Sequence, residues 1–145
     1  MKVEFRKAKL KDIEGIVELC NECFDENTDI KEAKRIFKNY RRDKNQIYLV
    51  GIVDKKIVCH TKITIIPTIY EKMGTYSIIN HVCVKEEYRR HHLATKLLDE
   101  VTKICKDYNC KAIELWSNNF RVPAHECYKN YGFIVNDAKF FSKEI

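Results

Sequence analysis

The segment Ile79–Leu98, INHVCVKEEYRRHHLATKLL, decides the fold because the spacing of its apolar residues changes within it. Residues 81–84, HVCV, suit a buried strand, whereas residues 94–101 carry leucines and a valine at helical spacing. Arg89 and Arg90 lie in the turn between them. The first N–H groups of a helix lack partners and carry roughly half a positive charge. The segment therefore predicts an anion site suited to a pyrophosphate. A strand and helix joined by a solvated basic turn is the alternative.

Length and composition predict one soluble globular domain covering residues 1–145. The chain has 145 residues, of which 45% are hydrophobic and 33% charged, enough to bury a core of its own. Apolar runs stay well short of the roughly 18 residues of a membrane span. Residues 1–8 are charged and lack the apolar centre of a signal peptide. We therefore expect a cytoplasmic protein that does not bind membranes.

The seven cysteines are odd in number and scattered along the chain, which indicates a reducing compartment and not a disulfide framework. Cys20 and Cys23 have a CxxC spacing, and Cys105 and Cys110 form a looser pair. The CxxC residues fall in a helical pattern, and neither pair has the glycine-rich turns of a zinc knuckle. We therefore expect small buried thiols and no metal site, with metal binding and redox chemistry as the alternatives.

The net charge of +6 fits either a polyanion partner or an anionic cofactor. Lysines are spread along the whole chain and are not gathered with aromatic residues in one stripe, as they are in many nucleic-acid-binding proteins. We therefore favour an anionic cofactor and keep nucleic-acid binding as a minor alternative.

The apolar pattern predicts one compact unit with long regular elements, because glycine and proline are few. Strands are expected at residues 3–8, 47–53, 57–69, 76–84 and 112–116, with a last strand or pair near residues 133–142. Helices are expected at residues 13–24, 30–41, 92–107 and 123–130. The order βααβββαβαβ predicts an α/β (α+β) fold, a mixed sheet with helices on both faces.

Two motifs resemble those of a known superfamily. Residues 89–94, RRHHLA, follow a strand and align with the pattern Gln/Arg-x-x-Gly-x-Gly/Ala, with His92 in place of the first glycine. Residues 124–133, AHECYKNYGF, align with Ala-x-x-aromatic-Tyr-x-x-x-Gly-Phe, with Cys127 in place of the aromatic residue. On these motifs and the order of elements, the chain resembles the GCN5-related N-acetyltransferase (GNAT) superfamily over essentially its full length.

The resemblance implies acetyl-CoA as the cosubstrate. Its pantetheine arm would pair with the strand residues 82–84, and the backbone N–H groups of residues 90–95 would bind the pyrophosphate. Since glycine allows close approach of a phosphate, the side chain of His92 must point away, or add a charged contact when protonated. The implied cofactor-binding residues are Val82, Cys83, Val84, Arg89, Arg90, His91, His92, Leu93, Ala94, Thr95 and Asn119.

The implied reaction is direct transfer of acetyl to a primary amine of a small molecule or peptide in a ternary complex. Tyr128 matches the superfamily's proton donor, and a phenol with a pKa near ~10 stays protonated at neutral pH. The N–H of Val82 or Cys83, at a bulge in the fourth strand, would polarise the acetyl carbonyl. Many members place a glutamate where this chain has Asn80, so the base stays open.

Three candidates for the base remain: a water held by Asn80, His81 beside it, and His60 on the preceding strand. Neighbouring strand residues point to opposite faces, so we expect only one of Asn80 and His81 to face the site. A structural role is the alternative for each histidine.

Features around the site leave further alternatives. Acidic residues at positions 25, 26 and 29 suit either a cationic amine acceptor or a solvated turn. Asn118 and Asn119 suit either a contact with the pantetheine arm or a helix cap. Two other functions stay open, an acetyl-CoA-binding sensor without transfer activity and the nucleic-acid module. We also expect that the chain is able to form a homodimer.

Overall fold

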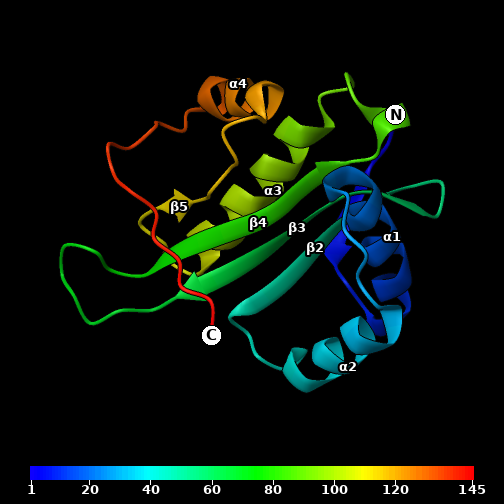
Figure 1. The fold of residues 1–145 in the computed structure, drawn as a ribbon, viewed down its shortest axis with the longest axis horizontal. Helices are drawn as coiled ribbons and strands as arrows, with labels where there is room; N and C mark the ends of the chain where they lie inside the picture. Colours follow the sequence, from blue (N-terminus) through cyan, green and yellow to red (C-terminus); the bar gives the residue numbers. More distant parts are fainter.

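The computed structural model, which describes residues 1–145, contains one five-stranded sheet in the order β1-β2-β3-β4-β5 (Figure 1). The first four strands pair antiparallel and β5 runs parallel to β4, so the sheet is mixed. The strands are β1 Glu4–Lys7, β2 Gln46–Val53, β3 Lys56–Ile66, β4 Tyr76–Val84 and β5 Ile113–Glu114.

Helices cover both faces of this sheet. They are α1 Ile13–Phe24, α2 Ile30–Tyr40, α3 Leu93–Asp107 and α4 Val122–Tyr131, with short 3₁₀ turns η1 Leu10–Asp12 and η2 Glu86–Tyr88. Because side chains alternate along a strand, Leu49 lies in the core on the α3 side, whereas Val50 lies in the core under α1 and α2. None of the four helices combines the length and the apolarity needed to cross a membrane.

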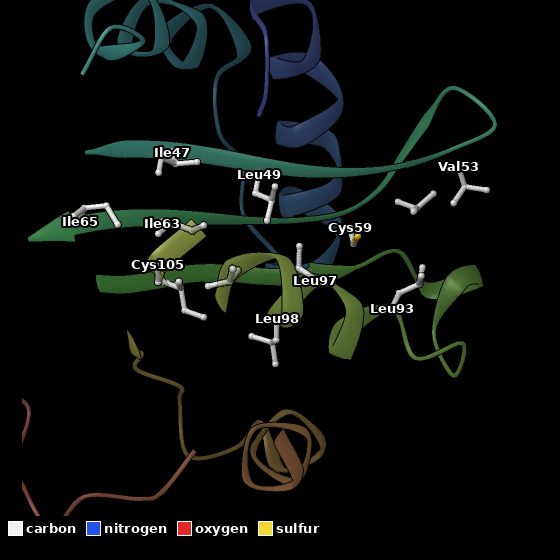
Figure 2. Packing of buried hydrophobic residues seen from close by; sticks show 13 residues of the cluster. Ile47, Leu49, Val53, Cys59, Ile63, Ile65, Leu93, Leu97, Leu98 and Cys105 are labelled. Atoms are coloured by element: carbon white, nitrogen blue, oxygen red, sulfur yellow. The ribbon is translucent and has the colours of Figure 1, made fainter. Parts of the chain in front are cut away.

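Packing of α3 fixes where its N-terminus lies. Leu93, Leu97, Leu98, Val101 and Cys105 are buried against β2, β3 and β4 (Figure 2). Burying a leucine side chain contributes about 1.5–3 kcal/mol, so this stripe holds the helix firmly on the sheet. The first turn of α3 therefore lies at a fixed place beyond the end of β4.

The predicted mixed α/β fold is confirmed, with one wrong element. The helix predicted at residues 13–24 and the strand predicted at residues 76–84 have the observed bounds, and the strand predicted to extend to Ile69 ends at Ile66, before Pro67.

The strand expected near residues 133–142 is not formed, since no backbone of that segment joins the sheet. Its residues Ile134, Val135, Phe140 and Phe141 stay exposed, so the segment has no buried face on which a strand would pack.

Candidate functional site

An unpaired edge of β4 forms one side of the candidate site. β5 pairs with β4 only at Ser77 and Ile78, and from there to Val84 the β5 side of β4 has no partner strand. The N–H of Lys85 donates to β3, and backbone groups alternate in direction along a strand. The N–H and C=O groups of Val82 and Val84 therefore point toward the open edge, while those of Cys83 point toward β3.

A β-bulge lies in the middle of this edge. The register between β3 and β4 shifts between His60 and Lys62, so that an extra residue of β4 is accommodated. His81 has φ of 53°, in the left-handed region, and marks the bulge. The expected bulge in the fourth strand is thus present. It also overturns the expectation that only one of Asn80 and His81 faces the site, since both side chains are exposed on the same side and His81 Nδ1 lies 3.3 Å from Asn80 Oδ1.

His81 is held from the other side by the end of α1 and the loop that follows it. Its Nε2 lies 2.9 Å from Oε1 of Glu26, and its ring packs edge-on against Phe24 with centroids 4.9 Å apart. Both side chains are about 40% exposed, so the contact adds little to stability. Its main effect is to orient the imidazole. The sequence contained Glu26 in an acidic loop but gave no sign of this pairing.

The rest of the acidic loop has local structural roles. Asp29 is the N-cap of α2, and its Oδ1 accepts hydrogen bonds from the N–H groups of Lys31 and Glu32. Asp25 ends α1 with φ of 51°. Of the three acidic residues considered for a cationic acceptor, Asp29 caps a helix and Glu26 contacts His81, so two of them have partners within the protein, which neither the acceptor nor the solvated turn had anticipated.

His60, the third candidate base, is enclosed in the core. It is 2% exposed, its Nδ1 lies 2.8 Å from the carbonyl oxygen of Leu49, and its ring stacks on Tyr48. Burial lowers the pKa of His60 to about 4, so the imidazole is neutral at physiological pH. The structure gives His60 a structural role.

The N-terminus of α3 has the backbone geometry of an anion site. The first bond within the helix runs from the N–H of Lys96 to the carbonyl of His92, which leaves the N–H groups of residues 93–95 ahead of it without helical partners. Arg90 and His92 have φ of 65° and 60°, the left-handed backbone that favours glycine. The side chains of His91 and His92 are exposed. These residues fit a pyrophosphate, and the glycine in the superfamily pattern marks a real conformational requirement.

The side chains of Arg89 and Arg90, the two arginines of the turn, have different surroundings. Arg89 Nε donates to the carbonyl of Val84 over 3.0 Å, and its Nη2 lies 3.8 Å from Sγ of Cys23. Its guanidinium therefore lies against the end of β4. Arg90 is exposed, and it is the residue of the pair whose charge is available to an anion at the helix.

Tyr128 lies on α4 and packs against the core on the α3 side. Burial raises the pKa of Tyr128 to about 12. No protein group hydrogen-bonds its hydroxyl, whereas the hydroxyl of Tyr131 donates to Asp99 over 2.7 Å and lies 3.2 Å from Thr102 Oγ1. Of the two tyrosines in the second motif, only Tyr128 has its hydroxyl free for another partner.

The end of the second motif is structural. Gly132 has φ of 116° and ends α4, with its N–H donating back to the carbonyl of Tyr128. Phe133 then packs on the ring of Tyr128 with centroids 5.8 Å apart. The glycine and phenylalanine of the motif therefore fix the position of the tyrosine.

The start of α4 reaches the same site. The guanidinium of Arg121 lies over the ring of Phe24 at 4.7 Å, so Phe24 contacts both Arg121 and His81. Asn118 and Asn119 are exposed before α4, and Asn118 accepts the N–H of Arg121 with its backbone carbonyl. No side chain caps this helix, so the helix-cap alternative for the two asparagines is not realised.

One surface groove lies away from this site. It measures about 850 Å³ and runs past the start of α1 and the hairpin between β2 and β3, with the ion pair of Arg6 and Asp12 in its wall. It contains none of the predicted site residues, and its lining mixes both charges. All seven cysteines are free thiols, and no group of three or more His, Cys, Asp or Glu side chains is arranged to hold a metal ion.

Comparisons with known proteins identify the family and the fold of the chain. The model of the Acetyltransferase (GNAT) family matches residues 13–133. A search of curated protein sequences found no match. Among solved structures, a predicted acetyltransferase of Clostridium acetobutylicum, determined with acetyl-CoA, is 25% identical with a TM-score of 0.78, over 98% of this chain and 96% of that one.

Two other solved structures share the fold at lower identity. Glucosamine-6-phosphate N-acetyltransferase from Arabidopsis thaliana is 21% identical with a TM-score of 0.83, over 99% of both chains. A transcriptional regulator from Bacillus halodurans C-125 is 20% identical with a TM-score of 0.89, over 99% of this chain and all of that one.

Proposed function

The chain belongs to the Acetyltransferase (GNAT) family, and from this premise we propose that it transfers acetyl from acetyl-CoA directly to a primary amine of a small molecule or peptide. The family match confirms the predicted acyltransferase class. The observation that carries the proposal is the open edge of β4, which has a bulge in its middle and the N-terminus of α3 at its end.

The chain's residues would bind the cosubstrate along this edge. The N–H groups of residues 93–95 would hold the pyrophosphate, with the charge of Arg90 beside them. Both backbone groups of Val82 and the N–H of Val84 would pair with the amides of the pantetheine arm, as in strand addition, while the carbonyl of Val84 accepts from Arg89. Asn119 is exposed at the border of the site and is the side chain proposed to contact the arm.

Two groups would act on the reacting thioester, which acetyl-CoA supplies. The N–H of Val82 is a better candidate than that of Cys83 for polarising the acetyl carbonyl, because the backbone of Cys83 is turned toward β3. Tyr128 would give its proton to the departing thiolate. With a pKa of about 12 it remains protonated at neutral pH, and no protein group competes for its hydroxyl.

His81 is our proposed base, and Glu26 its positioning residue. If Nε2 of His81 carries the proton donated to Glu26, then Nδ1 holds the lone pair that accepts a proton from the amine. The side-chain amide of Asn80 lies beside Nδ1, with its Oδ1 at 3.3 Å, where it would hold a water that relays the proton to that nitrogen. This assignment unites two of the three candidate bases in one arrangement.

A thiol-release assay with a panel of amines tests the proposed function. We expect coenzyme A to appear only when acetyl-CoA and a suitable amine are both present. A rise in melting temperature with excess acetyl-CoA, but no turnover with any amine, would favour the sensor. No rise in melting temperature would refute the cofactor assignment.

The base is tested separately with His81→Ala and Glu26→Gln. We expect His81→Ala to lower kcat by about 10²-fold, in the range of general-base effects, and Glu26→Gln to have a smaller effect on kcat. Glu26→Asp should restore part of the loss, because a shorter carboxylate is still able to accept from Nε2. If His81→Ala and the unmodified protein had the same kcat, a water and not His81 would be the general base.

Oligomeric state and location stay predictions. Light scattering of the purified protein would show whether it forms the expected homodimer, and cell fractionation would test the cytoplasmic location.

A further inference from the structure

Three cysteines from two elements meet beside the open edge of β4. Cys20 and Cys23 lie one turn apart on α1, and Sγ of Cys20 is 4.0 Å from Sγ of Cys83 on β4. One turn along the same helix, Sγ of Cys23 lies 3.7 Å from the carbonyl oxygen of Val84, the residue that follows Cys83. Cys20 and Cys83 are buried, whereas Cys23 is partly exposed. Cys23 is thus the member of the cluster that a reagent in solution reaches.

The surroundings of Cys23 favour its thiolate. The neighbouring thiol of Cys83 and the guanidinium of Arg89, whose Nη2 lies 3.8 Å from Sγ, lower the pKa of Cys23 to about 7 against the opposing effects of burial and of Glu22. At pH 7 a thiol with this pKa is about half ionised, compared with roughly 3% for an ordinary cysteine. Burial instead raises the pKa of Cys105, Cys110 and Cys127, among the other thiols.

We propose that Cys23 is a site of reversible oxidation by a hydroperoxide, with Cys83 as the resolving thiol. The thiolate of Cys23 attacks the peroxide, an S–O bond forms as the O–O bond breaks, and one water (or an alcohol) leaves after protonation. The thiol of Cys83 then loses its proton and attacks the sulfenic sulfur, so that an S–S bond forms and the S–O bond breaks with loss of water. Two thiols are oxidised and one peroxide is reduced.

The disulfide would form at the proposed cofactor edge. Sγ of Cys23 lies 3.7 Å from the carbonyl oxygen of Val84, and Arg89 donates to the same oxygen. An S–S bond of about 2 Å would join α1 to β4 covalently at this point. We expect weaker binding of acetyl-CoA by the oxidised protein, and this consequence rests on the proposed function. The oxidation itself does not.

Peptide mapping of the purified protein tests the oxidation. The protein is treated with hydrogen peroxide, alkylated and digested with trypsin without reduction, and a peptide pair linked through Cys83 is expected to disappear with dithiothreitol. Trypsin leaves Cys20 and Cys23 on one peptide, since no lysine or arginine lies between them. The linkage should therefore persist in Cys20→Ala and be lost in Cys23→Ala. Persistence in Cys23→Ala would overturn the proposal.

A trapping experiment identifies the first oxidised residue. Cys83→Ser keeps a polar hydroxyl beside Cys23 but removes the resolving thiol, so the sulfenic acid of Cys23 should react with dimedone in this variant. A dimedone adduct that appears first on Cys110 or Cys127 would overturn the proposal. Because mass is the readout, neither experiment depends on acetyl transfer, and failure of the oxidation is distinguishable from failure of the proposed function.

Arg89→Ala and Arg90→Ala form a matched pair for the role of the guanidinium. Alkylation of Cys23 at pH 7 should slow several-fold in Arg89→Ala, within the ~15-fold limit set by the two thiolate fractions. In Arg90→Ala the rate should change less than about twofold, since the side chain of Arg90 makes no contact with the thiol. Equal rates in both variants would overturn the role of Arg89.

Discussion

Replacing Tyr128 with phenylalanine removes one hydroxyl and leaves the ring. The ring packs against Phe133 and the core, so the packing survives the change. No protein group hydrogen-bonds the hydroxyl, so removing it leaves no protein group without its partner. No buried polar side-chain atom elsewhere in the protein lacks a partner either. We therefore expect the free energy of unfolding to change by less than about 0.5 kcal/mol.

The effect on catalysis should be far larger than the effect on stability. Loss of a general acid lowers kcat by about 10²- to 10⁴-fold. This corresponds to about 2.7–5.4 kcal/mol of transition-state stabilisation, since each tenfold change is worth about 1.36 kcal/mol. We expect a loss of at least 10²-fold for Tyr128→Phe, with little change in the affinity for acetyl-CoA.

Tyr131→Phe is the matched control, because it removes the same atom one turn further along α4. That hydroxyl bonds Asp99 and Thr102, so its loss should cost about 1–2 kcal/mol of stability and leave kcat within a few-fold. The assay is thiol release at saturating acetyl-CoA, with melting temperature measured on the same samples. Unchanged turnover in Tyr128→Phe, or an equal loss in both variants, would refute the role given to Tyr128.

The raised pKa of Tyr128 also sets the expected pH dependence. A proton donor works while it is protonated, that is, at pH below its pKa of about 12. Loss of the acid should therefore not contribute to any fall in kcat between pH 7 and pH 10. A fall in that range that is present in the unmodified protein and absent in Tyr128→Phe would contradict the assignment.

Three further predictions concern the backbone and the ion pair near β1. His92→Gly should raise stability by about 0.5–1 kcal/mol in urea unfolding, because φ of 60° strains a residue with a Cβ, whereas His92→Ala should give no such gain. Gly132→Ala should lower stability by about 1–2 kcal/mol in the same assay, because φ of 116° is strained for alanine although its Cβ would meet no atom within 4 Å. Asp12→Asn should cost about 1–3 kcal/mol at pH 7. Hydrogen bonds from Arg6 keep the pKa of Asp12 below its unfolded value, so this contribution is complete above the unfolded pKa near ~3.9 and is lost as the pH falls through the lower folded pKa. The difference between Asp12→Asn and the unmodified protein should therefore vanish in strong acid.

Elements with a strong apolar period were predictable from the sequence. The helix at residues 13–24 buries five residues at helical spacing, and the strand at residues 76–84 is bounded by a turn and by the basic segment. The superfamily pattern also singled out His92, where the glycine was explained by close approach of a phosphate. The structure adds a second reason for a glycine, since φ of His92 is 60°. Local pattern and local backbone thus determined these features.

The missed features depend on distant contacts. Glu26 and His81 are 55 positions apart, and no pattern in either segment signals their pairing. The bulge at His81 breaks the alternation on which the orientation of Asn80 and His81 was predicted. The last strand failed for a related reason. Its apolar residues match a strand, but a strand also needs a neighbour that offers backbone groups and a face to cover.

β4 links the fold to the proposed chemistry because its two edges have different roles. On the β3 side its backbone is paired, and Ile79 and Cys83 are buried, which holds the strand in place. On the other edge, β5 pairs with β4 only at Ser77 and Ile78, which leaves backbone groups of the later residues without a partner strand. At the bulge, the side chain of His81 contacts Glu26. A regular β4 paired along its whole length would be a better strand and would have no such edge. The irregular part of β4 is therefore the part from which function is to be expected. His81 in that part, and Cys23 of α1 beside it, are the residues whose replacement best tests that reasoning.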